Sequence, residues 1–264
     1  MKILVLIKQV PDTTDVKIDP VTNTLKREGV AAVINPFDMY AIEEALRVKE
    51  RIGRDAEVVA ISMGPPQAKE ALKEAISMGC DSAILLSDRK FAGSDTWATS
   101  YTLSQAVKKI GDYKVIFCGK QASDGDTAQV GPGVSMHLDI PQVTYVKKIE
   151  KIDGEKATLE RMTEEGYDII ETPLPAVFTV VKEINEPRLP SLKGKMKAKK
   201  AEIPVWSAED IGCEEDKIGL DGSPTRVVKV FTPAPREGGQ IIAGEADEIA
   251  VKLAVVLKDI VLGG

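Results

Sequence analysis

The sequence has few of the residues that proteins use to hold metal ions. Its 264 residues include one histidine and three cysteines, Cys80, Cys118 and Cys213. A catalytic zinc site usually draws on several histidines, and an iron–sulfur cluster takes about four thiolates. We therefore expect no metal site and no catalytic residue set in this chain. Redox or group-transfer chemistry would have to come from a bound organic cofactor or from a partner.

The sequence also gives little support for disulfides or membrane segments. The three cysteines are odd in number and far apart, without a C-x-x-C pair, which argues against a disulfide framework and favours a reducing compartment. The apolar run at the N-terminus, Ile3 to Ile7, is too short for a signal peptide or for a membrane span of ~20 residues. We expect a cytoplasmic protein that does not insert into a membrane.

The charge balance does not favour nucleic acid as a partner. The formal net charge is −6, and an acidic chain has little nonspecific affinity for phosphate backbones. One lysine group stands out, made up of Lys193, Lys195, Lys197, Lys199 and Lys200. It has no interleaved aromatic residues, so we expect a loop that faces solvent or a partner protein.

The first half of the chain has the pattern of a doubly wound α/β domain. Continuous apolar runs, typical of strands buried on both faces, occur at Ile3–Ile7, Glu57–Ser62, Ser82–Leu86 and Val115–Cys118. Helical periods separate them, one of them ended by Gly79 and another starting near Ser94 or Asp95. This alternation predicts a parallel sheet with right-handed crossovers.

The pattern changes after about Pro141. The segment from Lys151 to Glu155 contains Asp-Gly between apolar residues, which predicts a hairpin, and residues 176–181 form another apolar run. From Asn185 to Lys200 no helical or strand period is visible. A last helix is expected at about 247–261. We predict a domain at 1–184 and an extended arm at 185–264 that wraps a partner subunit. An arm folded back on its own domain is the alternative.

Three segments are expected at the carboxyl ends of the strands, where open α/β sheets bind ligands. They are Lys8–Asp12, Asn35–Asp38 with Asp38 as a helix cap, and Gly119–Gly133. The last is rich in small residues and leads into a helix, which suits a phosphate. Asp124 and Asp126 argue against phosphate unless they cap amides or face away. Phosphate binding and an ordinary capped loop both remain open.

Several motifs resemble the small (beta) subunit of electron-transfer flavoproteins. The matching segments are K-Q-V-P-D from Lys8, N-P-F-D from Asn35, M-G-P-P from Met63, G-K-Q-A-S-D-G-D-T-A-Q-V-G-P from Gly119, N-E-P-R from Asn185 and M-K-A-K-K from Met196. The family's signature region, residues 159–179, is partly met. Arg161, Glu164, Gly166, Pro175 and Thr179 match it, whereas Glu165 and Asp168 depart from it.

The resemblance implies an adenine-nucleotide alpha-hydrolase-like fold and a nucleotide in this subunit, with an FAD in a partner alpha subunit. Carried over by motif, the residues that would bind the nucleotide are Leu6, Asn35, Pro36, Phe37, Asp38, Met63, Ala122, Ser123, Asp124, Gly125, Asp126, Thr127, Ala128, Gln129, Val130, Gly131, Pro132 and Gly133. These residues fall on the strand ends that the pattern alone selected.

The resemblance also implies a recognition loop between Arg188 and Lys200 that docks on acyl-CoA dehydrogenases. Leu192 would be its anchor, since an exposed apolar residue among lysines combines a hot spot with steering charges. The alternative is that Leu192 packs against its own chain.

The family has two versions. In simple carriers this subunit holds a structural AMP, and electrons pass between acyl-CoA dehydrogenases and another acceptor. In the bifurcating version it holds FAD, which takes hydride from NADH; one electron then goes to ferredoxin or flavodoxin and the other to the dehydrogenase through the alpha-subunit FAD. The opening K-Q-V-P-D-T-T with K-I-D-P at 17–20, and D-G-D-T-A-Q-V-G-P, resemble the bifurcating type more closely.

Two other classes share such a nucleotide-binding fold. An ATP-using pyrophosphatase-type enzyme typically carries S-G-G-x-D-S after strand one, where this chain has K-Q-V-P-D from Lys8. A regulatory nucleotide binder of stress-protein type would need a G-x-x-G loop late in the domain, and would leave the segment after Asn185 without a role.

Overall fold

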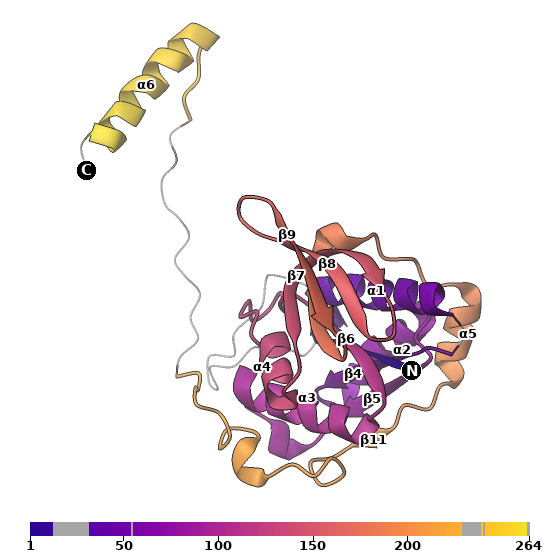
Figure 1. Ribbon diagram of the computed structural model, residues 1–264. Coiled ribbons are helices and arrows are strands. Elements are labelled where there is room, and N and C mark those ends of the chain that lie inside the picture. The colour runs from indigo at the N-terminus through magenta and orange to yellow at the C-terminus, as the bar shows by residue number, and fades with distance from the viewer. Residues whose placement is uncertain (13–31, 54, 229–238, 240, 263–264) are drawn as a thin grey trace. The chain divides into compact units, whose positions relative to one another are not determined.

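The computed structural model describes residues 1–12, 32–53, 55–228, 239 and 241–262 (Figure 1). The chain divides into two compact units, Met1–Val228 and Lys229–Gly264. Each unit is described by itself.

The first unit is built around a nine-stranded sheet with the order β11-β5-β4-β1-β6-β10-β7-β8-β9. Its strands are β1 Lys2–Leu6, β4 Glu57–Met63, β5 Ser82–Leu86, β6 Tyr113–Gly119, β7 Gln142–Ile152, β8 Lys156–Met162, β9 Tyr167–Pro173, β10 Ala176–Val180 and β11 Val205–Trp206. Neighbours from β11 to β7 are parallel, whereas β7, β8 and β9 are antiparallel. Two short strands, β2 Gln9–Pro11 and β3 Ala32–Ile34, pair separately.

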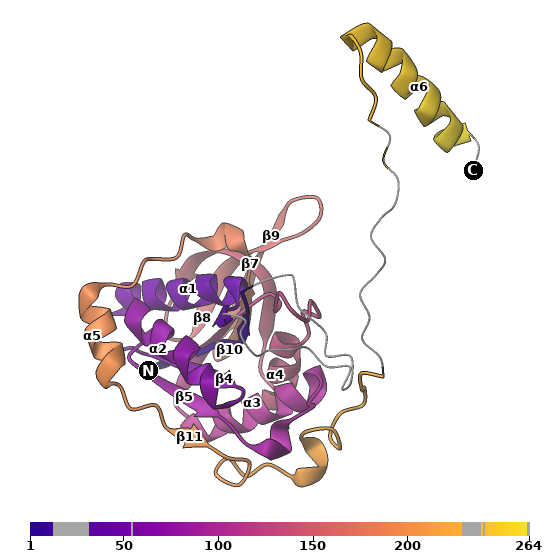
Figure 2. The ribbon, with the colours of Figure 1, turned by 180° about the vertical axis from the view of Figure 1, so that it is seen from behind.

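Helices cover both faces of the central strands, as Figure 2 shows from behind. The helices of this unit are α1 Pro36–Ile52, α2 Lys69–Met78, α3 Thr96–Ile110, α4 Val130–Leu138 and α5 Leu192–Lys200. Alternate residues of β1 enter two separate cores: Ile3 packs with residues of α1 and α2, and Leu4 with residues of α3 and α4. Burying one such side chain stabilises the fold by about 1.5–3 kcal/mol. The predicted doubly wound α/β fold is confirmed.

Local signals in the sequence set several element ends as expected. The carboxylate of Asp95 accepts hydrogen bonds from the amides of Trp97 and Ala98 at 2.9 and 3.1 Å, and so caps α3. Gly79 ends α2 with a φ of 140°, a conformation that favours glycine. Asp153 accepts from the amides of Glu155 and Lys156 in the predicted hairpin between β7 and β8.

One expectation was wrong. The stretch from Asn185 to Lys200, which shows no helical period, contains helix α5, capped by the Ser191 hydroxyl at 2.9 Å from the amide of Gly194. Ala198 is the one buried residue of this helix, so no apolar stripe could reveal it. Gly194 lies so close to the carbonyl of Ser77 on α2 that no side chain would fit between them.

Ion pairs hold the segment before α5 against α1. The Arg188 guanidinium donates to Glu43 at 2.7 Å and to Glu50 at 2.6 Å. Burial alone would raise the pKa of Glu43, but hydrogen bonds from Arg188 and Arg47 outweigh it and hold that pKa below its ordinary value. Asn185 donates to the carbonyl of Tyr40 at 3.0 Å. Residues 185–188 therefore lie on the first unit, while the predicted wrapping of a partner by residues 185–264 stays a prediction.

The second unit contains α6, Ala246–Leu262, at the place where a last helix was expected. Among its described side chains, Val251, Leu253, Val255 and Leu257 are exposed. Within the described residues of the chain, no helix is long and apolar enough to cross a bilayer.

We expect Arg188→Ala to lower the free energy of unfolding by about 1–3 kcal/mol, because it leaves the buried Glu43 with fewer donors. Denaturant unfolding measures the change. Lys73→Ala is the control: its pair with Glu70, 2.8 Å long, is exposed and contributes about 0–1 kcal/mol. Equal unfolding midpoints for the two variants would contradict the role given to Arg188.

Candidate functional site

The carboxyl ends of three adjacent strands form one edge of the sheet. Leu6 ends β1, Met63 lies at the end of β4, and Gly119 ends β6. The order β4-β1-β6 places these ends side by side, and α1 and α4 both begin at this edge. Leu6 is buried and Met63 half-buried. The edge is the place that the parallel topology selects for a ligand.

The carboxylate of Asp38 joins two of these strand ends. One oxygen accepts a hydrogen bond from the amide of Lys8 at 2.7 Å, and the other accepts from the amide of Gly119 at 3.0 Å. The prediction that Asp38 caps α1 was wrong: Asn35 is at the cap position, and its side chain does not accept from the helix. The amides beyond β1 and β6 need acceptors, and Asp38 supplies them.

Burial changes the acidity of this carboxyl. Removal from water raises the pKa of Asp38 from its ordinary 3.8 to about 7, although the amides of Lys8 and Gly119 and the Asn35 side chain act in the opposite direction. The folded state therefore holds this proton more tightly than the unfolded state does. It follows that the free energy of unfolding falls as the pH rises from about 4 to about 7.

Asn35 ties the same edge to the long loop after β6. Its side-chain amide donates to the carbonyl of Gln121 at 2.9 Å, and its side-chain oxygen accepts from the amide of Ser123 at 3.0 Å. Its main-chain amide donates to the carbonyl of Lys8 at 2.8 Å. Since Asn35 and Asp38 are both buried and bonded to main chain, they position the loops around the edge.

The loop itself turns tightly between β6 and α4. The amide of Asp126 donates to the carbonyl of Ala122 at 2.8 Å, and Asp126 and Ala128 have φ angles of 53° and 55°. Asp126 accepts from the side chain of Gln121, and Asp124 accepts from the Lys8 ammonium at 2.6 Å. Both carboxylates that argued against phosphate thus face donors of the protein itself. Of the other loop residues, Ser123, Gly125 and Thr127 are exposed.

The glycines at the start of α4 serve close packing. A Cβ on Gly131 would lie 2.5 Å from Cγ2 of Thr179 and 2.9 Å from Sγ of Cys118. Gly133 lies against the hydroxyl of Ser100. Gln129 accepts from Thr96 at 2.9 Å, next to Val130 and Pro132 in the first turn of α4. These contacts fix where the helix begins at the edge.

Two lysines at this edge lie in the segments expected at the strand ends, Lys8–Asp12 and Gly119–Gly133, but were not among the residues carried over by motif as nucleotide ligands. Lys8 follows β1, and Lys120 follows β6 with its ammonium 5.1 Å from the ring of Phe37. Their position in the sequence could have identified them as site residues, because each follows an apolar run that ends at the ligand-binding edge. Pro36 and Phe37 are the first two residues of α1.

Leu192 lies elsewhere. It is the first residue of α5 and is 78% exposed. The ammonium of Lys197 on the same helix donates to the carbonyl of Cys80, just before β5. This places α5 near the amino ends of the strands, away from Asn35 and Asp38.

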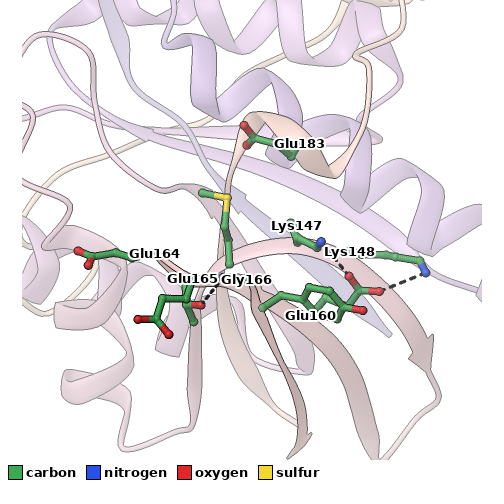
Figure 3. A pocket seen from close by; sticks show the side chains of 10 residues that line it. Lys147, Lys148, Glu160, Glu164, Glu165, Gly166 and Glu183 are labelled. Carbon is green, nitrogen blue, oxygen red and sulfur yellow. Dashed lines mark hydrogen bonds and ion pairs between the residues drawn. The ribbon is translucent and has the colours of Figure 1, made fainter.

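The signature region forms the β8–β9 hairpin and leads into β10. Its Glu164 and Gly166, with the departing Glu165, line an open cavity of about 650 Å³ (Figure 3). Glu160 there pairs with Lys147 at 3.2 Å. A second cavity, of about 270 Å³, is lined by Trp97, Tyr101, His137 and Lys217. Neither cavity is lined by the predicted nucleotide residues. The K-I-D-P motif at 17–20 lies outside the described residues.

Comparisons with known proteins agree on one family. The family model of the electron transfer flavoprotein domain matches residues 22–211. Electron transfer flavoprotein subunit beta of Thermoanaerobacterium thermosaccharolyticum is 53% identical over 254 residues, covering 96% of each chain. The subunit beta of Megasphaera elsdenii is 48% identical over 99% of this chain and 98% of its own. Caffeyl-CoA reductase-Etf complex subunit CarD of Acetobacterium woodii is 48% identical over 98% of each.

We expect Gly119→Ala to lower the free energy of unfolding by about 1–3 kcal/mol, because its Cβ would lie 2.5 Å from Cβ of Phe37 and 2.6 Å from the Asp38 carboxylate. Gly154→Ala is the matched control, since nothing lies within 4 Å of a Cβ there. Denaturant unfolding of both variants tests this. An unfolding midpoint of Gly119→Ala equal to that of Gly154→Ala would count against the junction formed by Asp38.

Proposed function

The chain belongs to the electron transfer flavoprotein family as a beta subunit, and we propose that it binds FAD at the carboxyl ends of β1, β4 and β6. Subunits of this kind pair with an alpha subunit, in which we place a second FAD. The observation that carries the proposal is the network of Asn35 and Asp38, which joins the segment after β1 to the loop after β6. Such a network fixes the positions of the loops before a ligand binds, and it leaves the exposed groups of the loop available to the ligand.

We propose that the bound flavin takes hydride from NADH and divides the electron pair, one electron going to a ferredoxin or flavodoxin and one to the alpha-subunit FAD. The support is the resemblance of the K-Q-V-P-D-T-T opening and of D-G-D-T-A-Q-V-G-P to bifurcating sequences. The redox chemistry belongs to the cofactor, while the protein binds it, orients it and tunes its surroundings. The free thiols Cys80, Cys118 and Cys213 support a cytoplasmic location.

The residues at this edge suit a nucleotide bearing phosphate. The ammonium groups of Lys8 and Lys120 lie at the edge, and the loop leads into the N-terminus of α4, whose first amides favour an anion. Asp124 and Asp126 accept from Lys8 and Gln121, which reduces their repulsion of phosphate. The same features would hold AMP in a simple carrier, and that version is the alternative outcome of the flavin count below.

We propose that α5 docks on an acyl-CoA dehydrogenase, which receives the electron from the alpha-subunit FAD. Leu192 is exposed at the start of this helix among Lys193, Lys195 and further lysines. Apolar anchors surrounded by charge are typical of interface hot spots. The relative CarD is named as a subunit of a caffeyl-CoA reductase complex, which supports a partner enzyme that acts on a CoA thioester.

The proposed cofactor content is tested by co-expressing the chain with its alpha subunit and counting flavins and AMP in the purified heterodimer. Two FAD molecules per heterodimer are expected. One FAD with one AMP would overturn bifurcation in favour of the simple carrier. ATP turnover, or a stable homodimer that ignores the alpha subunit, would point to one of the other nucleotide-binding classes.

We expect Leu192→Ala to raise the apparent KM for the dehydrogenase about tenfold, because it removes the apolar anchor. The flavin content should not change, since Leu192 lies on α5, away from the strand ends. Electron transfer is measured against dehydrogenase concentration. Leu220→Ala, at a half-exposed leucine in another segment, is the control. Loss of flavin, or transfer kinetics equal to the control, would count against docking through α5.

A further inference from the structure

Lys8 has a fixed main chain and a half-exposed side chain. Its amide donates to Asp38 at 2.7 Å, and its carbonyl accepts from Asn35 at 2.8 Å, so its backbone is held on both sides directly after β1. Its side chain is 48% exposed. The position of the Cα atom is therefore set by the buried network, while the ammonium can reorient within the length of one side chain.

The ammonium of Lys8 is held by an anion from the loop that the nucleotide is proposed to contact. Its Nζ lies 2.6 Å from Oδ1 of Asp124, a residue 116 positions later in the chain. Asp124 lies in the turn closed by the hydrogen bond from Asp126 to Ala122. The Lys8 side chain is 48% exposed and that of Asp124 is 19% exposed, so water competes for the ammonium, and ion pairs at the surface are weak for that reason. A phosphate group has more charge and more acceptor oxygens than one carboxylate, and can therefore replace Asp124 as the partner of the Lys8 ammonium.

The other charged groups at this edge have different partners. Lys120 lies over the rings of Phe37 and Tyr145, at 5.1 and 5.6 Å. Asp126 accepts from Gln121, and the buried Asp38 accepts from two amides. Among the described residues of the edge, Lys8 is thus a half-exposed cation that pairs with a carboxylate of the loop itself.

We propose that Lys8 binds the phosphate of the adenine nucleotide and that Asp124 competes with this phosphate for the Lys8 ammonium. The inference rests on the proposed nucleotide site and adds to it the group that recognises the anion. It also gives Asp124 a role opposite to that of a ligand contact: its carboxylate lowers the affinity for the nucleotide and closes the loop against β1 when the phosphate is absent.

The test compares AMP with adenosine, which lacks the phosphate. The heterodimer with the alpha subunit is first freed of nucleotide by denaturation and refolding. AMP or adenosine is then titrated into it, and the affinity is measured by calorimetry. Asp124→Asn is expected to raise the affinity for AMP about threefold to tenfold, and Lys8→Gln to lower it about tenfold or more. Affinity for adenosine should be the same in the wild type and both variants. Lys8→Arg, which keeps the cation, should retain most of the AMP affinity.

Matched controls separate this effect from overall charge. Lys156 and Glu171 form an exposed pair of 2.9 Å on the β8–β9 hairpin. Lys156→Gln and Glu171→Gln change the net charge as the two site variants do, and should leave both affinities unchanged. Effects on AMP equal to those at Lys8 and Asp124 would overturn the proposal.

Other outcomes distinguish failure of this inference from failure of the proposed nucleotide site. Lower AMP affinity in Asp124→Asn would make Asp124 a ligand contact and overturn the competition. Equal losses for AMP and adenosine in Lys8→Gln, not restored in Lys8→Arg, would give Lys8 a structural role only. Wild-type protein that binds neither AMP nor FAD would overturn the nucleotide site as well. Wild-type binding that neither variant changes would overturn this inference alone.

Discussion

One buried carboxylate holds the edge of the sheet together. Parallel strands leave amides without ladder partners where they end, and the loops that follow need acceptors in places that water cannot reach. Asp38 supplies acceptors to Lys8 after β1 and to Gly119 at the end of β6. Asn35, one turn earlier, attaches the loop after β6 to the same junction by donating to the carbonyl of Gln121. The geometry of the proposed nucleotide site therefore depends on the first turn of α1, although Asn35 and Asp38 are themselves buried.

The fold could be predicted because burial leaves a trace in local sequence. Strands buried on both faces read as continuous apolar runs, such as Ile3–Ile7, and helix ends follow from residues such as Asp95 and Gly79. Helix α5 left no such trace, since Ala198 is its one buried residue and lysines fill most of the rest. A helix held mainly by its cap and by contacts of small residues has no apolar period to detect.

The site could be predicted by place but not by role. Topology put Asn35–Asp38 and the loop from Gly119 at one edge, and the structure joins them there. The role of Asp38 depends on a hydrogen bond that spans 81 residues of sequence, and no local spacing encodes such a partner. For the same reason, the sequence could not show through which partner Asp124 acts, because its pair with Lys8 forms only when two distant loops meet.

The two proposed contacts lie at opposite edges of one sheet. The nucleotide site is placed at the carboxyl ends of β1 and β6, whereas α5 packs near the start of β5, where Lys197 reaches the carbonyl of Cys80. Figure 1 draws α5 beside the N-terminus, and β1 begins there. A dehydrogenase docked on Leu192 would therefore not touch a flavin held at the strand ends of this subunit. Under the proposed function, the electron that reaches the dehydrogenase has to leave through the partner subunit, and we therefore expect docking and cofactor binding to be altered independently.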